Sequence, residues 1–110
     1  MTADAPRTVR YVVLHHTGFG EPHFDLLIDA EGAGPLLSWR LSRWPLVGGD
    51  AVPAAVHRRE YLDYEGPVSR GRGAVMQAAV GTVEIVSRDQ ETICARFPGT
   101  GCTVELNLRS

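Results

Sequence analysis

Histidine and aspartate stand at positions from which their side chains could bind one ion. In an extended strand, residues two apart point to the same face, so the imidazole of His23 and the carboxylate of Asp25 project together. His16 ends the preceding strand, and the short connection at 17–22 brings the two strands side by side. Two imidazoles and a carboxylate are a common ligand set for Mn²⁺, Fe²⁺ or Zn²⁺. The alternative is a polar rim in which these groups hydrogen-bond to one another. His15 should face the other way, packed or solvated.

A second polar cluster runs from His57 to Gly66 and is rich in arginine, tyrosine and carboxylates. A histidine that titrates near neutrality, with Tyr61 and arginine nearby, suits acid–base work or phosphate binding. The alternative is a solvated loop whose charges pair with one another.

A glycine-rich segment follows at residues 66–73 and leads into a predicted strand. Its glycines allow close approach of the backbone to a ligand, and its arginines, among them Arg72, could bind phosphate. The segment is not a Walker loop, because the Gly-Lys-Ser/Thr ending and the following helix are both missing. A plain β-turn is the alternative.

Short strands must position these groups, because glycine and proline interrupt the chain at short intervals. The expected strands are 9–16, 23–29, 36–41, 51–57, 73–80, 82–87, 92–97 and 102–108. They predict an all-β fold, a small closed or nearly closed antiparallel β-barrel of about eight strands, because closure removes exposed edges. A helical turn is expected at 60–64. We expect a flexible N-terminus over residues 1–8 and a single domain over 9–110.

The length and the net charge of the chain exclude some classes of function. A chain of 110 residues is enough for one compact domain. A formal net charge of −2 argues against a protein that coats nucleic acid by bulk charge, but not against one that grips a strand end locally. All 11 basic residues are arginine, and six of them lie between Arg40 and Arg72. Arginine suits bidentate recognition of phosphate or carboxylate.

The two cysteines flank a predicted hairpin turn. If Phe97 faces Cys102, then Cys94 faces Glu105, so the thiols are out of register for a disulfide and both should be reduced and packed. No apolar run approaches the ~20 residues of a membrane helix. The N-terminus lacks the basic patch and apolar core of a secretory signal. We therefore expect a cytoplasmic protein with no membrane partner.

Taken together, the motifs resemble the 3′-phosphoesterase domain of bacterial DNA ligase D, and more closely its short stand-alone relatives. The segments that carry the resemblance are Tyr11–His16, His23–Leu26, Ser38-Trp39, His57–Gly66 and Gly71–Gly73. The resemblance runs from about Tyr11 to Thr82, and the block from Tyr61 to Gly66 is its most specific part.

The resemblance implies a small β-barrel with a crescent-shaped groove that acts, with Mn²⁺ or a similar divalent ion such as Zn²⁺, on the 3′ end of a DNA strand. Such domains remove a terminal ribonucleotide and then a 3′-phosphate, and they leave a 3′-hydroxyl for repair. By resemblance, His16, His23 and Asp25 would bind the metal. His57 would contact the reacting phosphate or transfer a proton, together with Tyr61.

Substrate contacts are implied for Ser38 and for Arg43, where the family usually has lysine. The chain departs from the family at Leu27, which replaces the arginine of a His-Tyr-Asp-x-Arg motif that grips the phosphate. Arg40 or Arg72 would have to supply that contact from a neighbouring strand. A Leu27→Arg variant is expected to restore or raise the activity.

Two further departures concern the loops. The interval from His16 to His23 is longer than usual, so His15 could compete as the metal ligand. Ser69 stands where the family often has glutamate.

Three functions follow from these observations. The first is a metal-dependent phosphoesterase on nucleic-acid 3′ ends. The second is the same barrel used as a small-molecule enzyme (an isomerase, cyclase or hydrolase of a biosynthetic pathway), with Leu27 making its site friendlier to an apolar substrate. The third is an inactive binding or accessory module, for example a partner of a separately encoded polymerase or ligase.

Overall fold

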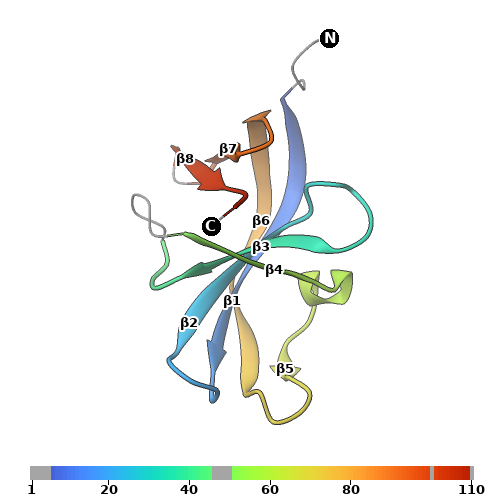
Figure 1. Ribbon diagram of the computed structural model, residues 1–110, viewed down its shortest axis with the longest axis vertical. Coiled ribbons are helices and arrows are strands. Elements are labelled where there is room, and N and C mark those ends of the chain that lie inside the picture. The colour runs from blue at the N-terminus through green and yellow to red at the C-terminus, as the bar shows by residue number, and fades with distance from the viewer. Residues whose placement is uncertain (1–5, 46–50, 100, 110) are drawn as a thin grey trace.

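The computed structural model describes residues 6–45, 51–99 and 101–109 (Figure 1). Its elements are β1 (Arg7–Thr17), β2 (His23–Ile28), β3 (Leu36–Leu41), β4 (Val52–His57), the 3₁₀ helix η1 (Arg59–Leu62), β5 (Gly66–Pro67), β6 (Ala74–Arg88), β7 (Thr92–Phe97) and β8 (Cys102–Asn107). In the described part of the chain, no helix is long and apolar enough to cross a membrane.

All strands belong to one antiparallel sheet in the order β4-β3-β2-β1-β6-β7-β8, with the short β5 paired to the start of β6. The predicted all-β antiparallel fold is confirmed, but the sheet is strongly curled and open rather than closed. Figure 1 shows β1 and β6 running along the molecule with β2 beside β1, while β3 and β4 run across them. β7 pairs with the far end of β6, from Glu84 to Arg88, and the edge strands β4 and β8 approach each other without pairing. The indole Nε1 of Trp39 on β3 bridges the open side, donating to the carbonyl oxygen of Asn107 at 2.6 Å.

The largest difference from the predicted strands lies in β6. The sequence predicts two strands separated at Gly81, but one strand runs through this residue. Gly81 pairs with Tyr11 of β1, and a Cβ atom at Gly81 would lie 3.3 Å from the Tyr11 ring. The glycine thus makes room for an aromatic ring on the adjacent strand and does not form a turn.

The ends of other elements differ from the prediction by smaller amounts. β1 already begins at Arg7, which pairs with Ile85, so the strand takes in two residues of the expected flexible N-terminus. Residues 1–5 of that expectation lie outside the described part. The expected helical turn is present as η1. The predicted hairpin register is confirmed, with Phe97 opposite Cys102 and Cys94 opposite Glu105. Cys94 is a free thiol, while the side chain of Cys102 is outside the described part.

The two faces of the sheet pack differently. One face, here called the core face, carries the largest buried apolar cluster: Val13, Leu26, Ile28, Ala30, Trp39, Leu41, Val83, Ile85, Ile93, Ala95, Phe97 and Leu106. The opposite face, here called the site face, carries a smaller one: Val12, Leu14, Leu27, Leu36, Leu62 and Val75. Successive residues of β1 and β2 alternate between the two clusters, as the pleat of a strand requires. Leu62 comes from η1, so this helix covers part of the site face.

Candidate functional site

His16, His23 and Asp25 converge on the site face beside its apolar cluster. Each offers one ligand atom, and the three atoms lie within 4.8 Å of one another. Asp25 lies between the two imidazoles, with its carboxylate 3.6 Å from Nδ1 of His16 and 3.3 Å from Nε2 of His23. His23 and Asp25 are buried, at 8% and 4% exposure. The predicted convergence is confirmed, and it arises because His16 and His23 face each other across the β1–β2 ladder.

Backbone carbonyls fix the orientation of both imidazoles. Nδ1 of His23 donates to the carbonyl oxygen of Glu21 at 3.0 Å, and Nε2 of His16 donates to that of Arg72 at 2.7 Å. In the neutral rings, the other nitrogens therefore carry lone pairs, and these point toward Asp25. Nε2 of His23 is buried and has no hydrogen-bond partner among the described residues.

This arrangement fits a divalent metal ion. Two nitrogen lone pairs and a carboxylate converge on one point. A cation bound at that point would accept the lone pairs and balance the carboxylate charge. Histidines that bind metals usually donate their other N–H to a carbonyl or carboxylate, as both of these do. The cluster of His16, His23 and Asp25 could thus hold a metal ion.

His15 does not join this cluster. Its ring stacks on Phe24, with centroids 4.6 Å apart and an interplanar angle of 20°. Phe24 packs against the core face, so His15 points to the side of the sheet opposite His16. Of these two neighbouring histidines, His16 is therefore the one that faces His23 and Asp25.

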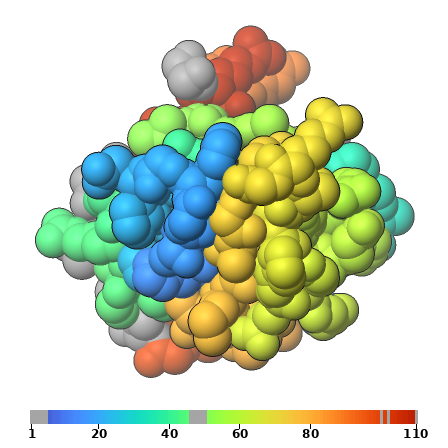
Figure 2. All heavy atoms as spheres, turned by 90° about the horizontal axis from the view of Figure 1, so that it is seen from below, coloured from blue at the N-terminus to red at the C-terminus, as the bar shows by residue number. Residues whose placement is uncertain are grey.

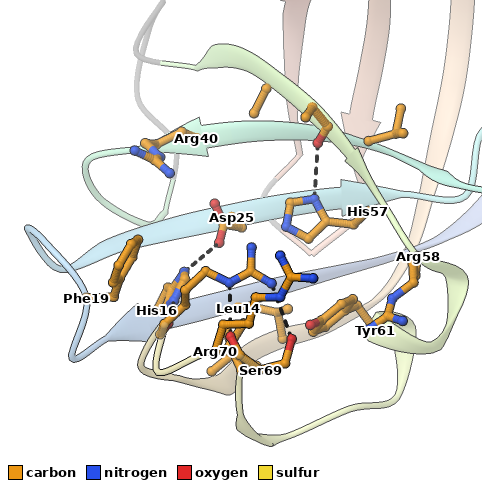
Figure 3. A pocket seen from close by; sticks show the side chains of 16 residues that line it. Leu14, His16, Phe19, Asp25, Arg40, His57, Arg58, Tyr61, Ser69 and Arg70 are labelled. Atoms are coloured by element: carbon orange, nitrogen blue, oxygen red, sulfur yellow. Dashed lines mark hydrogen bonds and ion pairs between the residues drawn. The ribbon is translucent and has the colours of Figure 1, made fainter.

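A groove of about 620 Å³ opens from this cluster along the site face. Figure 2 views the end of the molecule where the β1–β2 hairpin, in blue, lies against the loop before β6, in yellow. Figure 3 shows the interior, with Asp25 and His57 facing the same space. The groove is lined by Leu14, His16, Phe19, Asp25, Arg40, Ala54, Ala55, Val56, His57, Arg58, Tyr61, Val68, Ser69, Arg70, Arg72 and Val75.

His57 ends β4 and faces the groove from the side opposite the loop before β6 (Figure 3). Its Nδ1 donates to the carbonyl oxygen of Ala55 at 3.2 Å, which leaves the lone pair on Nε2. Burial lowers the pKa of His57 below its ordinary value of 6.5, against the opposing effect of the Asp25 charge. The ring is therefore neutral at pH 7. Tyr61 packs edge-on against it, with centroids 5.6 Å apart.

Four arginines line the groove: Arg40, Arg58, Arg70 and Arg72. Arg40 lies opposite Asp25 on the adjacent strand. Arg72 is held within its own turn, where Nε donates to the carbonyl oxygen of Ser69 at 3.0 Å and Nη2 to its Oγ at 3.3 Å. Asp25 is the one carboxylate among the residues lining this groove, so the groove favours an anionic ligand.

The glycine-rich segment packs closely against the end of β1. Gly73 has φ of +78°, and a Cβ atom there would lie 2.0 Å from the carbonyl oxygen of Thr17. No side chain fits in that space. The close approach brings the turn against the end of β1, where the carbonyl of Arg72 accepts the hydrogen bond from His16. Residues 69–71 form a turn between β5 and β6, and the backbone that follows this turn orients His16.

The block after Tyr61 anchors the loop to the sheet. The Tyr64 hydroxyl donates to the carbonyl oxygen of Pro67, and Glu65 accepts a hydrogen bond from the backbone N–H of Gln77 at 2.8 Å. Asp63 is paired with Arg10 at 2.7 Å. These contacts position η1 and the Tyr61 ring over the site face. In this block, only Tyr61 lines the groove.

Besides the buried His23 of the cluster, three positions discussed in the sequence do not line the groove. Ser38 is buried at 4% exposure on β3, opposite Leu27. Arg43 lies beyond the end of β3 and is not among the lining residues. Leu27 is fully buried in the apolar cluster of the site face, so it does not make the groove apolar for a ligand. Leu27→Arg would place a charge in that cluster, which speaks against the expected gain in activity.

Sequence reasoning did not assign site roles to Phe19, Arg58 and Arg70. Arg58 is adjacent to His57, and Arg70 lies in the glycine-rich segment, so both belong to motifs already noted. Phe19 stands alone in the loop after β1, where only its aromatic character between two glycines sets it apart.

No protein-family model matches the chain, and no match was found among curated proteins.

Proposed function

We propose that the protein is a divalent-metal-dependent phosphoesterase that acts on nucleic-acid 3′ ends, removing a terminal ribonucleotide or a 3′-phosphate. One observation carries the proposal. A cluster of His16, His23 and Asp25 that could hold a metal opens directly into a groove lined by four arginines. A metal ion beside guanidinium groups suits a phosphate ester, whose oxygens both can bind.

The ligand set supports Mn²⁺ as the metal. Two imidazole nitrogens and a carboxylate oxygen also suit Zn²⁺ and Fe²⁺, so the choice among these rests on the resemblance to manganese-dependent domains. When bound, the ion would act as a Lewis acid on the phosphate oxygens. His16 and His23 would hold it with ring nitrogens that the carbonyls of Arg72 and Glu21 already orient.

His57 would handle the proton. Its ring is neutral at pH 7 because burial lowers its pKa, and its N–H is committed to Ala55. Nε2 is therefore the atom that can accept a proton and return it to a departing oxygen. The edge-on ring of Tyr61 keeps this imidazole in place.

The arginines would bind the phosphate. Arg40 and Arg72 take the place that the resemblance gave to the arginine missing at Leu27, because both line the groove. Arg58 and Arg70 add two further cations along the same surface. Arg43 lies outside this set, so we assign it no phosphate contact in the proposed mechanism.

The test is a gel assay on a DNA primer–template with a 3′-phosphate or a single 3′-ribonucleotide. We expect trimming with Mn²⁺, none with chelator, and none by His23→Ala. His15→Ala is the matched control, because this histidine faces the other side of the sheet, and it should trim at the wild-type rate. A folded wild-type protein that leaves both ends intact with Mn²⁺, or a fully active His23→Ala, contradicts the proposal.

A further inference from the structure

Phe19 is a large aromatic side chain on the surface of the groove. The residue is 53% exposed, and it lines the same groove as His16, Asp25 and Arg40. Figure 3 shows it beside His16 at one end of the groove, with Arg40 on the nearby strand. A single exposed apolar side chain is ordinary on a protein surface, but Phe19 lies in the groove that also holds the arginines and two residues of the His/Asp cluster, where a bound ligand would cover its ring.

The hairpin backbone holds the ring at this place. Gly18 and Gly20 flank it with φ of +83° and +69°, a conformation that other residues rarely adopt. Gly18 also lies against Gly73, where an added Cβ would be 3.2 Å from the Gly73 Cα. The base of the hairpin is thus fixed against the turn that holds Arg72, and the aromatic ring extends beyond it.

We propose that Phe19 is a stacking platform for an unpaired nucleobase next to the phosphate bound at the His16–His23–Asp25 cluster. The inference rests on the proposed function and specifies that a base next to the bound 3′ end is unpaired in the complex. A cationic groove with an aromatic ring at its edge is how proteins hold single strands without reading their sequence. Every base has a π-face, so the ring selects a base over no base and not one base over another.

The test measures binding of short, dye-labelled single strands of DNA with a 3′-phosphate, by fluorescence anisotropy with chelator and with Mn²⁺. One strand carries all its bases, and the other is abasic at its terminal nucleotide. We expect Phe19→Ala to weaken binding of the complete strand on the order of 10-fold, as loss of one stacked base does. Binding of the abasic strand should stay unchanged. Phe19→Tyr keeps the ring and should keep the affinity.

Val80→Ala is the matched control, because Val80 is similarly exposed, at 58%, but does not line the groove. It should bind both strands like the wild type. The inference is overturned if Phe19→Ala weakens both strands equally or neither, even where the wild type binds and trims DNA. If the wild type binds neither strand and trims no 3′ end, the proposed function falls and takes this inference with it.

Discussion

The two faces of β2 share one strand and have opposite surroundings. Leu26 and Ile28 are sealed in the core face, whereas His23 and Asp25 lie on the site face beside the groove. The core face consists of apolar side chains packed against one another. The site face has an apolar floor with polar groups at its margin. Because side chains alternate along a strand, neighbouring residues of β2 belong either to the stabilising core or to the candidate site. Substitutions on the two faces should therefore affect different measurements.

The largest effect should come from the core face. Trp39→Ala removes a fully buried ring and the hydrogen bond from its Nε1 to Asn107. We expect the free energy of unfolding to fall by about 3–5 kcal/mol, measured by urea denaturation with circular dichroism. Trp39→Phe keeps an aromatic ring and should lose less. In conditions where Trp39→Phe is folded, its Mn²⁺ affinity should equal that of the wild type. A parallel loss of metal affinity would show that the faces are coupled.

Leu27→Arg tests the apolar floor of the site face, because it places a charge there. Leu27 has no exposed surface and packs with Leu14 and Leu62. An unpaired buried guanidinium should lower the free energy of unfolding by roughly 3 kcal/mol. Leu27→Met conserves volume and should cost less than about 1.5 kcal/mol. An Arg variant as stable as the wild type would mean that its side chain reaches the groove, and the trimming assay would then show whether it contributes there.

Asp25→Asn tests the site face with little change in shape. The amide carries no charge between the two imidazoles, so we expect the Mn²⁺ affinity to fall at least about 100-fold in isothermal titration calorimetry. Asp63→Asn is the matched control, since this carboxylate is exposed and pairs with Arg10 outside the cluster. It should leave metal binding unchanged. Equal affinities for Asp25→Asn and the wild type would exclude the cluster as the metal site.

The smallest effect should be the pH dependence that His57 contributes to stability. Burial lowers its folded pKa below 6.5, so the unfolded chain binds more protons between the two values. This contribution is therefore complete above about pH 6.5 and is lost as the pH falls through the lowered pKa. Subtracting the unfolding curve of His57→Gln from that of the wild type should isolate it. The stability of the wild type minus that of the variant should fall as the pH drops below about 6.5, and a difference that grows as the pH falls would contradict the sign.

Local rules suffice for much of the fold and for the convergence of the candidate metal ligands. The alternation of β2 and a short hairpin predict that His16, His23 and Asp25 converge, and they do. The register of the last hairpin follows from its turn in the same way. Both predictions need only neighbours along the chain and one adjacent strand.

Contacts between distant segments explain the features that the sequence patterns did not predict. Gly81 looks like a strand break until the Tyr11 ring is placed across it. Leu27 looks like a lost ligand contact until Leu62 of η1 covers it. Phe19 becomes part of the groove only because the β1–β2 hairpin lies against the turn at Gly73. Each of these depends on how the sheet curls, which pairing patterns in the sequence do not specify.

The order of the strands also determines where the sheet opens locally. β1 is the middle strand, with three strands on each side, whereas β4 is an edge. Opening of a sheet is easiest at its edges, so the amide hydrogens of β4 exchange with solvent long before those of β1. His16, His23 and Asp25 belong to the slowly exchanging centre of the sheet, and His57 ends the edge strand. The His57 side of the groove should thus open and close while the cluster of candidate ligands stays assembled.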